Sequence, residues 1–196
     1  MVSSICARVA LHRFPTNGGF TLAELLVVVS VIALLSTVFF AGFRSDGQAL
    51  ALERSARSFV QTVDQVRALS LSGGQHEGQT VSGGFGFYVQ QDQGSVLLFA
   101  DCNGDGEYQE NGASSTCADD ASEAVETVAL ESGITFDSIS PCTSGACTLT
   151  VVFVPPYAAS TFSPNLVGTE AIFVLKNSQD TTRQIRINTL GVTTTQ

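Results

Sequence analysis

The sequence predicts an α+β protein, in which a long N-terminal helix packs on an antiparallel β-sheet. From Leu25 to Phe43 no side chain is charged, and a run of this length is long enough to cross a bilayer as a helix. Apolar residues then recur at helical spacing as far as Leu69, and beyond Gly74 the period changes to the alternation typical of strands. A helix followed by a series of antiparallel strands is an α+β arrangement.

The segment before the apolar run is basic. Arg8 and Arg13 precede the first acidic residue, Glu24. A secretory signal is cut after its apolar stretch, at small residues, but the residues that close this run, 39–43, include three phenylalanines. We therefore expect the apolar run to be kept in the mature protein.

The junction between the two segments reads Gly19-Phe20-Thr21-Leu22-Ala23-Glu24. It resembles the prepilin cleavage and methylation motif of type IV pilins and type II secretion pseudopilins. The resemblance implies that a membrane peptidase cuts between Gly19 and Phe20, and that the new N-terminal Phe20 is N-methylated.

The same resemblance gives Glu24 a role in assembly. An acid at the head of a membrane helix is costly unless it is paired, and the family implies a partner, the amino terminus of a neighbouring subunit in a filament. The alternative is that Glu24 only marks the boundary of the span, with its carboxylate among the lipid headgroups.

Arg8 and Arg13 lie on the leader side of the span. By the positive-inside rule, we expect the leader in the cytoplasm and the domain after the span outside the inner membrane. The expected parts are a removed leader at 1–19, a transmembrane and assembly helix at 20–43, an amphipathic helix at 44–72 and an extracytoplasmic β-rich pilin domain at 73–196.

The helix is expected to continue beyond the membrane. No proline interrupts residues 20–72, and one face carries apolar residues at i, i+4 and i+7. This face consists of Leu52, Ala56, Phe59, Val63 and Val66. We expect it to dock on the sheet, and Gly73-Gly74 to end the helix.

Six segments after the helix have the composition of strands. They are 85–91, 95–100, 134–139, 148–154, 171–176 and 182–188. The last two are predicted to form a hairpin through residues 177–181. Within the family, this layout is most similar to the H-type minor pseudopilin. That similarity depends on the segments 99–106 and 185–191.

Five cysteines are an odd number for an exported protein, but Cys6 lies in the leader. Removal of the leader leaves four, which would form two disulfides in an oxidising compartment. Their spacing suggests local pairing of Cys102 with Cys117 and of Cys142 with Cys147, although three connectivities remain open.

One segment could bind an ion. Asp101, Asn103, Asp105 and Glu107 alternate with Cys102 and two glycines, which matches the first half of an EF-hand calcium loop. The glutamate expected at the end of such a loop is missing, and Glu110, or Asp119 and Asp120 brought near by a Cys102–Cys117 bridge, could replace it. The alternative is a plain turn, for which Asn-Gly and Asp-Gly are strong signals. Calcium is thus a hypothesis, and no cofactor is required.

Charge and composition disfavour two classes of function. The net charge is −9, and neither Lys nor Arg occurs between Arg67 and Lys176. Such a surface repels phosphate backbones, so nucleic-acid binding is disfavoured. No serine–histidine–acid set, phosphate loop or CxxC pair is present, and we predict no catalytic residue and no enzyme activity.

The resemblance therefore predicts a structural subunit of a type IV pilus or a type II secretion pseudopilus. Its implied partners are other subunits, prepilin peptidase, an assembly platform protein and membrane lipid. One alternative is a single-pass anchored binding domain or enzyme. Another is a pilus-tip subunit that binds DNA for competence through Arg183 and Arg186.

Overall fold

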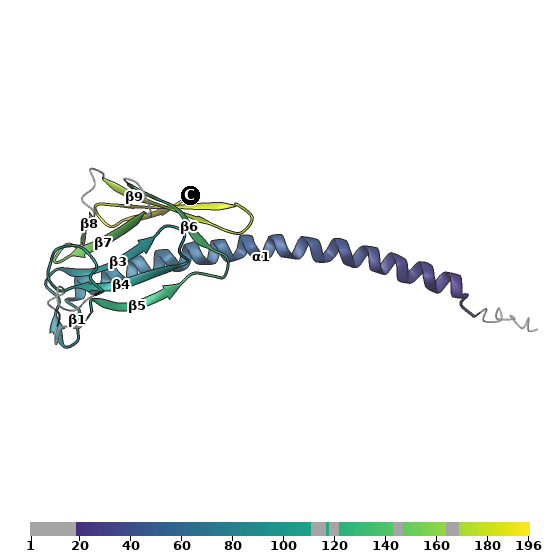
Figure 1. The fold of residues 1–196 in the computed structure, drawn as a ribbon, viewed down its shortest axis with the longest axis horizontal. Helices are drawn as coiled ribbons and strands as arrows, with labels where there is room; N and C mark the ends of the chain where they lie inside the picture. Colours follow the sequence, from purple (N-terminus) through teal and green to yellow (C-terminus); the bar gives the residue numbers. More distant parts are fainter. Residues whose placement is uncertain (1–18, 111–116, 118–121, 143–146, 164–168) are drawn as a thin grey trace, which may run out of the picture. The chain divides into compact units, whose positions relative to one another are not determined.

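The computed structural model describes residues 19–110, 117, 122–142, 147–163 and 169–196, with the backbone alone at 40–46. It divides into two compact units, Met1–Gly42 and Phe43–Gln196. The helix, α1, spans Leu22–Ser72. All of the strands belong to the second unit, as Figure 1 shows.

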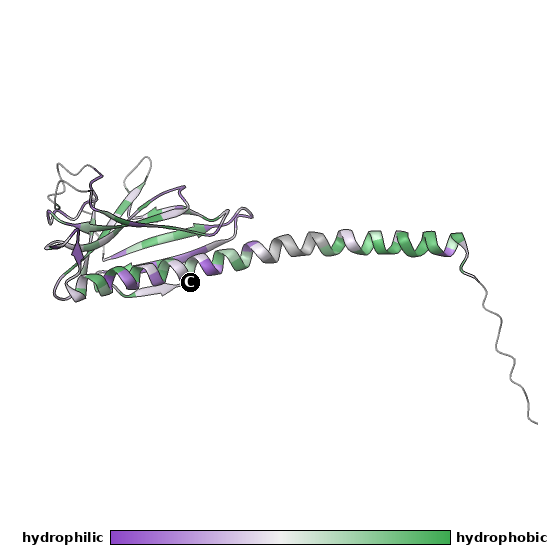
Figure 2. Cartoon of the chain, turned by 90° about the horizontal axis from the view of Figure 1, so that it is seen from below, coloured by the Kyte–Doolittle hydropathy of each residue, from purple (hydrophilic) through white to green (hydrophobic). Residues whose placement is uncertain are grey.

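The first part of α1 is apolar on every side. Figure 2 shows most of this part of the helix in the hydrophobic colour. The window Leu22–Phe39 has a mean hydropathy of 2.5, and none of it is buried within the protein. Its length and composition suit a membrane span.

The second part of α1 ends where two glycines were expected to end it. Gly73 adopts a left-handed φ of 65°, which favours glycine, and the Gly74 amide donates to the Leu69 carbonyl at 3.1 Å. A Cβ at Gly74 would lie 2.7 Å from the Phe85 ring. Ser70 then accepts the Phe85 amide at 2.8 Å, which connects the helix end to the first long strand.

The strands form two main antiparallel sheets and a short ribbon. The ribbon pairs β1 (Gln75–His76) with β2 (Gln79–Thr80). The five-stranded sheet has the order β5-β4-β3-β7-β8 and the four-stranded sheet the order β11-β10-β9-β6. Their bounds are Gly84–Gln90 (β3), Ser95–Asp101 (β4), Ala124–Ala129 (β5), Thr135–Ser140 (β6), Thr148–Val154 (β7), Ala159–Ser163 (β8), Glu170–Lys176 (β9), Thr182–Asn188 (β10) and Thr193–Thr195 (β11).

All six predicted strands are present within one residue of their expected bounds, and β9 pairs with β10 as the predicted hairpin. The strands β1, β2, β5, β8 and β11 were not predicted. Of these, β1, β2 and β11 have only two or three residues, and β5 lacks a clear alternation of buried and exposed residues.

The strands also divide between two sheets where a single sheet was expected. The turn after β3 connects them, since the Asp92 amide donates to the Phe136 carbonyl at 2.8 Å and the Phe136 amide donates to the Gln93 carbonyl at 3.0 Å. With this division, strands of both sheets contribute residues to the core against the apolar face of α1.

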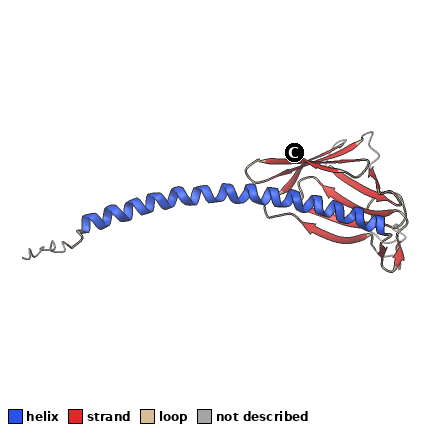
Figure 3. Cartoon of the chain, turned by 180° about the vertical axis from the view of Figure 1, so that it is seen from behind, coloured by secondary structure: helices blue, strands red, loops and turns tan. Residues whose placement is uncertain are grey.

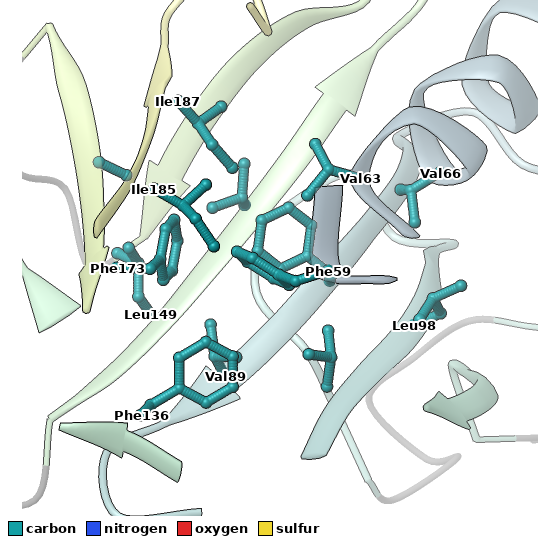
Figure 4. Close-up of a cluster of buried hydrophobic side chains, with 14 of the residues drawn as sticks. Phe59, Val63, Val66, Val89, Leu98, Phe136, Leu149, Phe173, Ile185 and Ile187 are labelled. Carbon is teal, nitrogen blue, oxygen red and sulfur yellow. The ribbon is translucent and has the colours of Figure 1, made fainter. Parts of the chain in front are cut away.

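One core joins α1 to both sheets. Figure 3 shows the second part of α1 running in front of the strands, and Figure 4 shows its apolar residues pointing at side chains of β6, β9 and β10. Phe59, 1% exposed, packs edge-on against Phe87, Phe136 and Phe173, with ring centroids 5.2–5.6 Å apart. The predicted helix face is therefore confirmed as the core face.

Candidate assembly site

The start of α1 is a capping box built from Thr21 and Glu24. The Glu24 carboxylate, through Oε2, accepts the Thr21 amide at 2.9 Å and the Thr21 hydroxyl at 3.0 Å. In return, the Glu24 amide donates to the Thr21 hydroxyl at 3.2 Å. This reciprocal pair satisfies two of the amides that a helix start leaves free.

The capping box positions the carboxylate and leaves part of it available. Within the described residues, Glu24 Oε1 has no hydrogen-bond partner. Phe20, the residue before the cap, is 83% exposed. The carboxylate can therefore accept a cationic group from another molecule without giving up its contacts with Thr21.

Sequence reasoning identified Glu24 but missed the role of Thr21. A threonine followed three residues later by glutamate, just before an apolar run, is the signature of a capping box. That signal was present in the sequence at Thr21-Leu22-Ala23-Glu24.

A family model described as the prokaryotic N-terminal methylation motif matches residues 15–40. The chain carries the signature of type IV pilins and pseudopilins. The pilin-type match includes Gly19, Phe20 and Glu24, and it is a structural motif rather than an enzymatic one. Cleavage after Gly19 and methylation of Phe20 stay predictions, as does the similarity to the H-type subfamily. No curated protein and no solved structure matches the chain.

The second candidate site is the acidic loop, residues 101–110, which follows β4. Asp101 is only 2% exposed, and its two carboxylate oxygens accept the amides of Gly104 at 2.7 Å and Gly106 at 3.0 Å. Burial raises the pKa of Asp101, and the two amides oppose that change. Asp101 thus organises the loop through its backbone.

The next two loop side chains repeat this pattern. Asn103 Oδ1 accepts the Asp105 amide at 3.0 Å, and Asp105 Oδ1 accepts the Glu107 amide at 2.8 Å. The other Asp105 oxygen accepts from the Asn103 side chain at 2.8 Å and from the Gln109 side chain. Each of these carboxylate and amide groups has a protein partner, which is the geometry of a turn held by its own side chains.

Glu123 lies against the acidic loop, and sequence reasoning missed it. The side chain is fully buried, and its oxygens accept the amides of Cys102 at 3.2 Å and Gln109 at 2.9 Å. Burial is the main reason that its pKa is raised to about 7, and the charges of Asp101 and Asp105 add to the effect. No local signal marks this glutamate, because only the fold brings it to residues 102 and 109.

The predicted calcium ligands are not drawn together around one point. Within the described part of the chain, the one group of three ligand atoms within 4.8 Å of one another comes from Cys102, Cys117 and Glu123. Because the two cysteines form a disulfide, only the carboxylate remains as an oxygen donor. Glu107 accepts the Ser163 hydroxyl at 2.7 Å, and Glu110 is exposed. Calcium binding stays a prediction.

Two disulfides are present in the second unit. Cys102 pairs with Cys117 and Cys142 with Cys147, with Cα–Cα distances of 5.3 and 5.8 Å. This is the local pairing that the spacing suggested. Cys6 lies outside the described residues.

Proposed function

We propose that this protein is a structural subunit of a type IV pilus or a type II secretion pseudopilus, assembled through its N-terminal helix. The observation that carries this proposal is the first part of α1. It is apolar around its whole circumference and unburied from Leu22 to Phe39, and the exposed Glu24 carboxylate stands at its head.

An apolar helix surface of this extent is stable only when something covers it. In the membrane, lipid would cover it, and in a filament the equivalent helices of neighbouring subunits would do so. Both environments suit a helix that makes no packing contacts of its own.

In this proposal, prepilin peptidase removes residues 1–19, and the methylated amino terminus of Phe20 in one subunit pairs with Glu24 in the next. A charge pair formed among apolar helices is shielded from water, and the low dielectric strengthens its attraction. A neutral residue at either position would remove this attraction and the axial register that it fixes. Thr21 would hold the carboxylate in place before the partner arrives.

The second unit would lie outside the inner membrane. Its two disulfides support this placement, because disulfides persist in oxidising compartments. A platform protein in the membrane would assist insertion of the subunit into the filament.

The pilus-tip DNA receptor is less well supported than the structural subunit. Its two candidate arginines are engaged with acids of the same unit, Arg183 with Glu53 at 3.4 Å and Arg186 with Glu170 at 3.2 Å. A gel shift with double-stranded DNA at low salt tests this alternative directly.

The deciding experiment is N-terminal mass spectrometry of the membrane-extracted protein, together with the yield of sheared filaments. We expect the chain to begin at N-methylated Phe20, and Glu24→Gln to lower filament yield at least tenfold. Asp64→Asn is the matched control, since it neutralises an exposed acid of the same helix outside the apolar segment. An unprocessed chain starting at Met1, or filaments unaffected by Glu24→Gln, would contradict the proposal.

A further inference from the structure

A groove opens between α1 and the edge of the four-stranded sheet, within the second unit. It has a volume of about 560 Å³, and helix residues between Glu53 and Gln61 line one side. Arg183 of β10 and Thr195 and Gln196 at the chain end line the other. Because β11 is the last strand of its sheet, no further strand of the described residues extends the sheet at this opening.

The groove carries two guanidinium groups that share one carboxylate. Arg57 Nε lies 3.0 Å from Glu53 Oε1, and Arg183 Nε lies 3.4 Å from Glu53 Oε2. No other acidic group of the described residues forms an ion pair with either arginine. Both arginine side chains are at least half exposed, at 75% and 51%. The side chains of the two arginines and Glu53 therefore sum to one positive charge, which faces solvent.

The acidic loop has the opposite imbalance. Asp105, Glu107 and Glu110 are exposed, and the sequence has no Lys or Arg between Arg67 and Lys176. In the part of the chain that the structure describes, none of the ion pairs involves an acid of this loop. Among the described residues, its charges therefore have no cationic ion-pair partner.

The groove and the loop lie at opposite ends of the second unit. From Arg57 to Ser72, where α1 ends, the helix rises about 22 Å at 1.5 Å per residue. The acidic loop starts near that end, since Ser70 accepts the Phe85 amide at 2.8 Å and the neighbouring Gly83 amide donates to the Asp101 carbonyl at 3.1 Å. One molecule cannot bring these two surfaces together, whereas two copies that point the same way can.

We propose that the acidic loop of one copy docks against the arginine groove of the next, as a head-to-tail contact between second units. This inference rests on the proposed filament function. A contact between two different surfaces repeats without closing, which is the property that an open filament requires. It also relieves repulsion among subunits whose full chain carries a charge of −9, and which become more negative when Arg8 and Arg13 are removed with the leader.

The test is a charge swap in the full-length protein, expressed with its assembly machinery and scored by sheared filament yield. We expect Arg57→Glu with Arg183→Glu to lower the yield at least tenfold, and Glu107→Arg with Glu110→Arg to do the same. Combining all four substitutions should restore the yield to within about threefold of wild type, because the complementary charges are present again.

Two control variants isolate the contact. Arg57→Lys with Arg183→Lys keeps the charge and should assemble nearly normally. Glu77→Arg with Glu126→Arg reverses two exposed acids outside the loop and should also assemble. Thermal unfolding of each variant in detergent shows whether the second unit is intact, and only folded variants are scored.

The outcomes separate the two proposals. If either reversal leaves the yield unchanged, or if the combination fails to restore it, the head-to-tail contact is wrong. If those results occur while Glu24→Gln abolishes filaments, the filament function stands without this contact. If the wild-type protein forms no filaments at all, both proposals are wrong.

Discussion

The two parts of α1 belong to one helix, but their apolar residues differ in how they are covered. From Leu22 to Phe39 no residue is buried within the protein. In the second unit, the helix buries a stripe that includes Phe59, Val63 and Val66, each at most 1% exposed. The second unit is therefore complete as a folded body, and the first part of the helix depends on a cover from outside the subunit.

Their acids differ in the same way. Glu24 is exposed and contacts only its own helix start, whereas Glu123 is fully buried and accepts amides from two separate loop positions. The comparison indicates that changes in the first part should affect assembly without affecting folding, and that changes in the second unit should affect folding first.

The strongest test of this difference is a pair of matched truncations. Phe59→Ala should lower the free energy of unfolding by about 3–5 kcal/mol, because it leaves a cavity among three aromatic rings. Leu26→Ala, at a position that is 62% exposed, should leave unfolding of the second unit unchanged. Chemical denaturation in detergent measures both, and a similar loss for Leu26→Ala would break the comparison.

The pH dependence of stability is a second test of the difference between the first part of α1 and the second unit. The pKa of Glu123 is raised from 4.5 to about 7 in the folded protein, so the folded state holds this proton more tightly than the unfolded state does. Stability from this group is present below about pH 4.5 and is lost as the pH rises through 7, by up to about 3 kcal/mol.

The measurement is the difference in unfolding free energy between wild type and Glu123→Gln from pH 4.5 to 8. The variant stays neutral throughout, so the difference should change across this window. Glu24→Gln serves as the control and should follow the wild-type curve. A difference that does not vary with pH would mean that Glu123 is not buried as described.

Calcium should act on the second unit alone. If it binds at the acidic loop, an excess of 100 times Kd would stabilise the folded state by about 2.7 kcal/mol. It should also flatten the pH dependence, because a cation near Glu123 favours the carboxylate. Thermal unfolding with calcium, then with chelator, tests this, and Asp105→Asn should weaken the effect. An unchanged midpoint would leave the plain turn as the explanation of the loop.

The smallest effect is expected at Thr21. Thr21→Ala removes the hydroxyl that contacts Glu24, so filament yield should fall several-fold, while unfolding of the second unit stays at its wild-type value. Thr21→Ser keeps the hydroxyl and should assemble normally. Equal yields for the alanine and serine variants would show that the capping box plays no part in assembly.

Much of this architecture could be predicted because its signals are local. Three features each depend on residues adjacent in the chain: the uncharged run, the end of α1 before Gly73, and the hairpin at 177–181. The strands β5 and β11 could not be predicted, since they take their place from pairing with β4 and β10 rather than from their own pattern. The burial of Glu123 has the same origin.

The sequence alone determined the long helix, its apolar first part, the Gly19–Glu24 junction and six of the strands, because helix and strand periodicity and charge are properties of short segments. Only the tertiary structure decided that the strands form two sheets, that Glu123 is buried against the acidic loop, and that Arg57 and Arg183 share Glu53 at the edge of β11. Those arrangements depend on residues far apart in the chain, whose contacts arise only when the core around Phe59 closes.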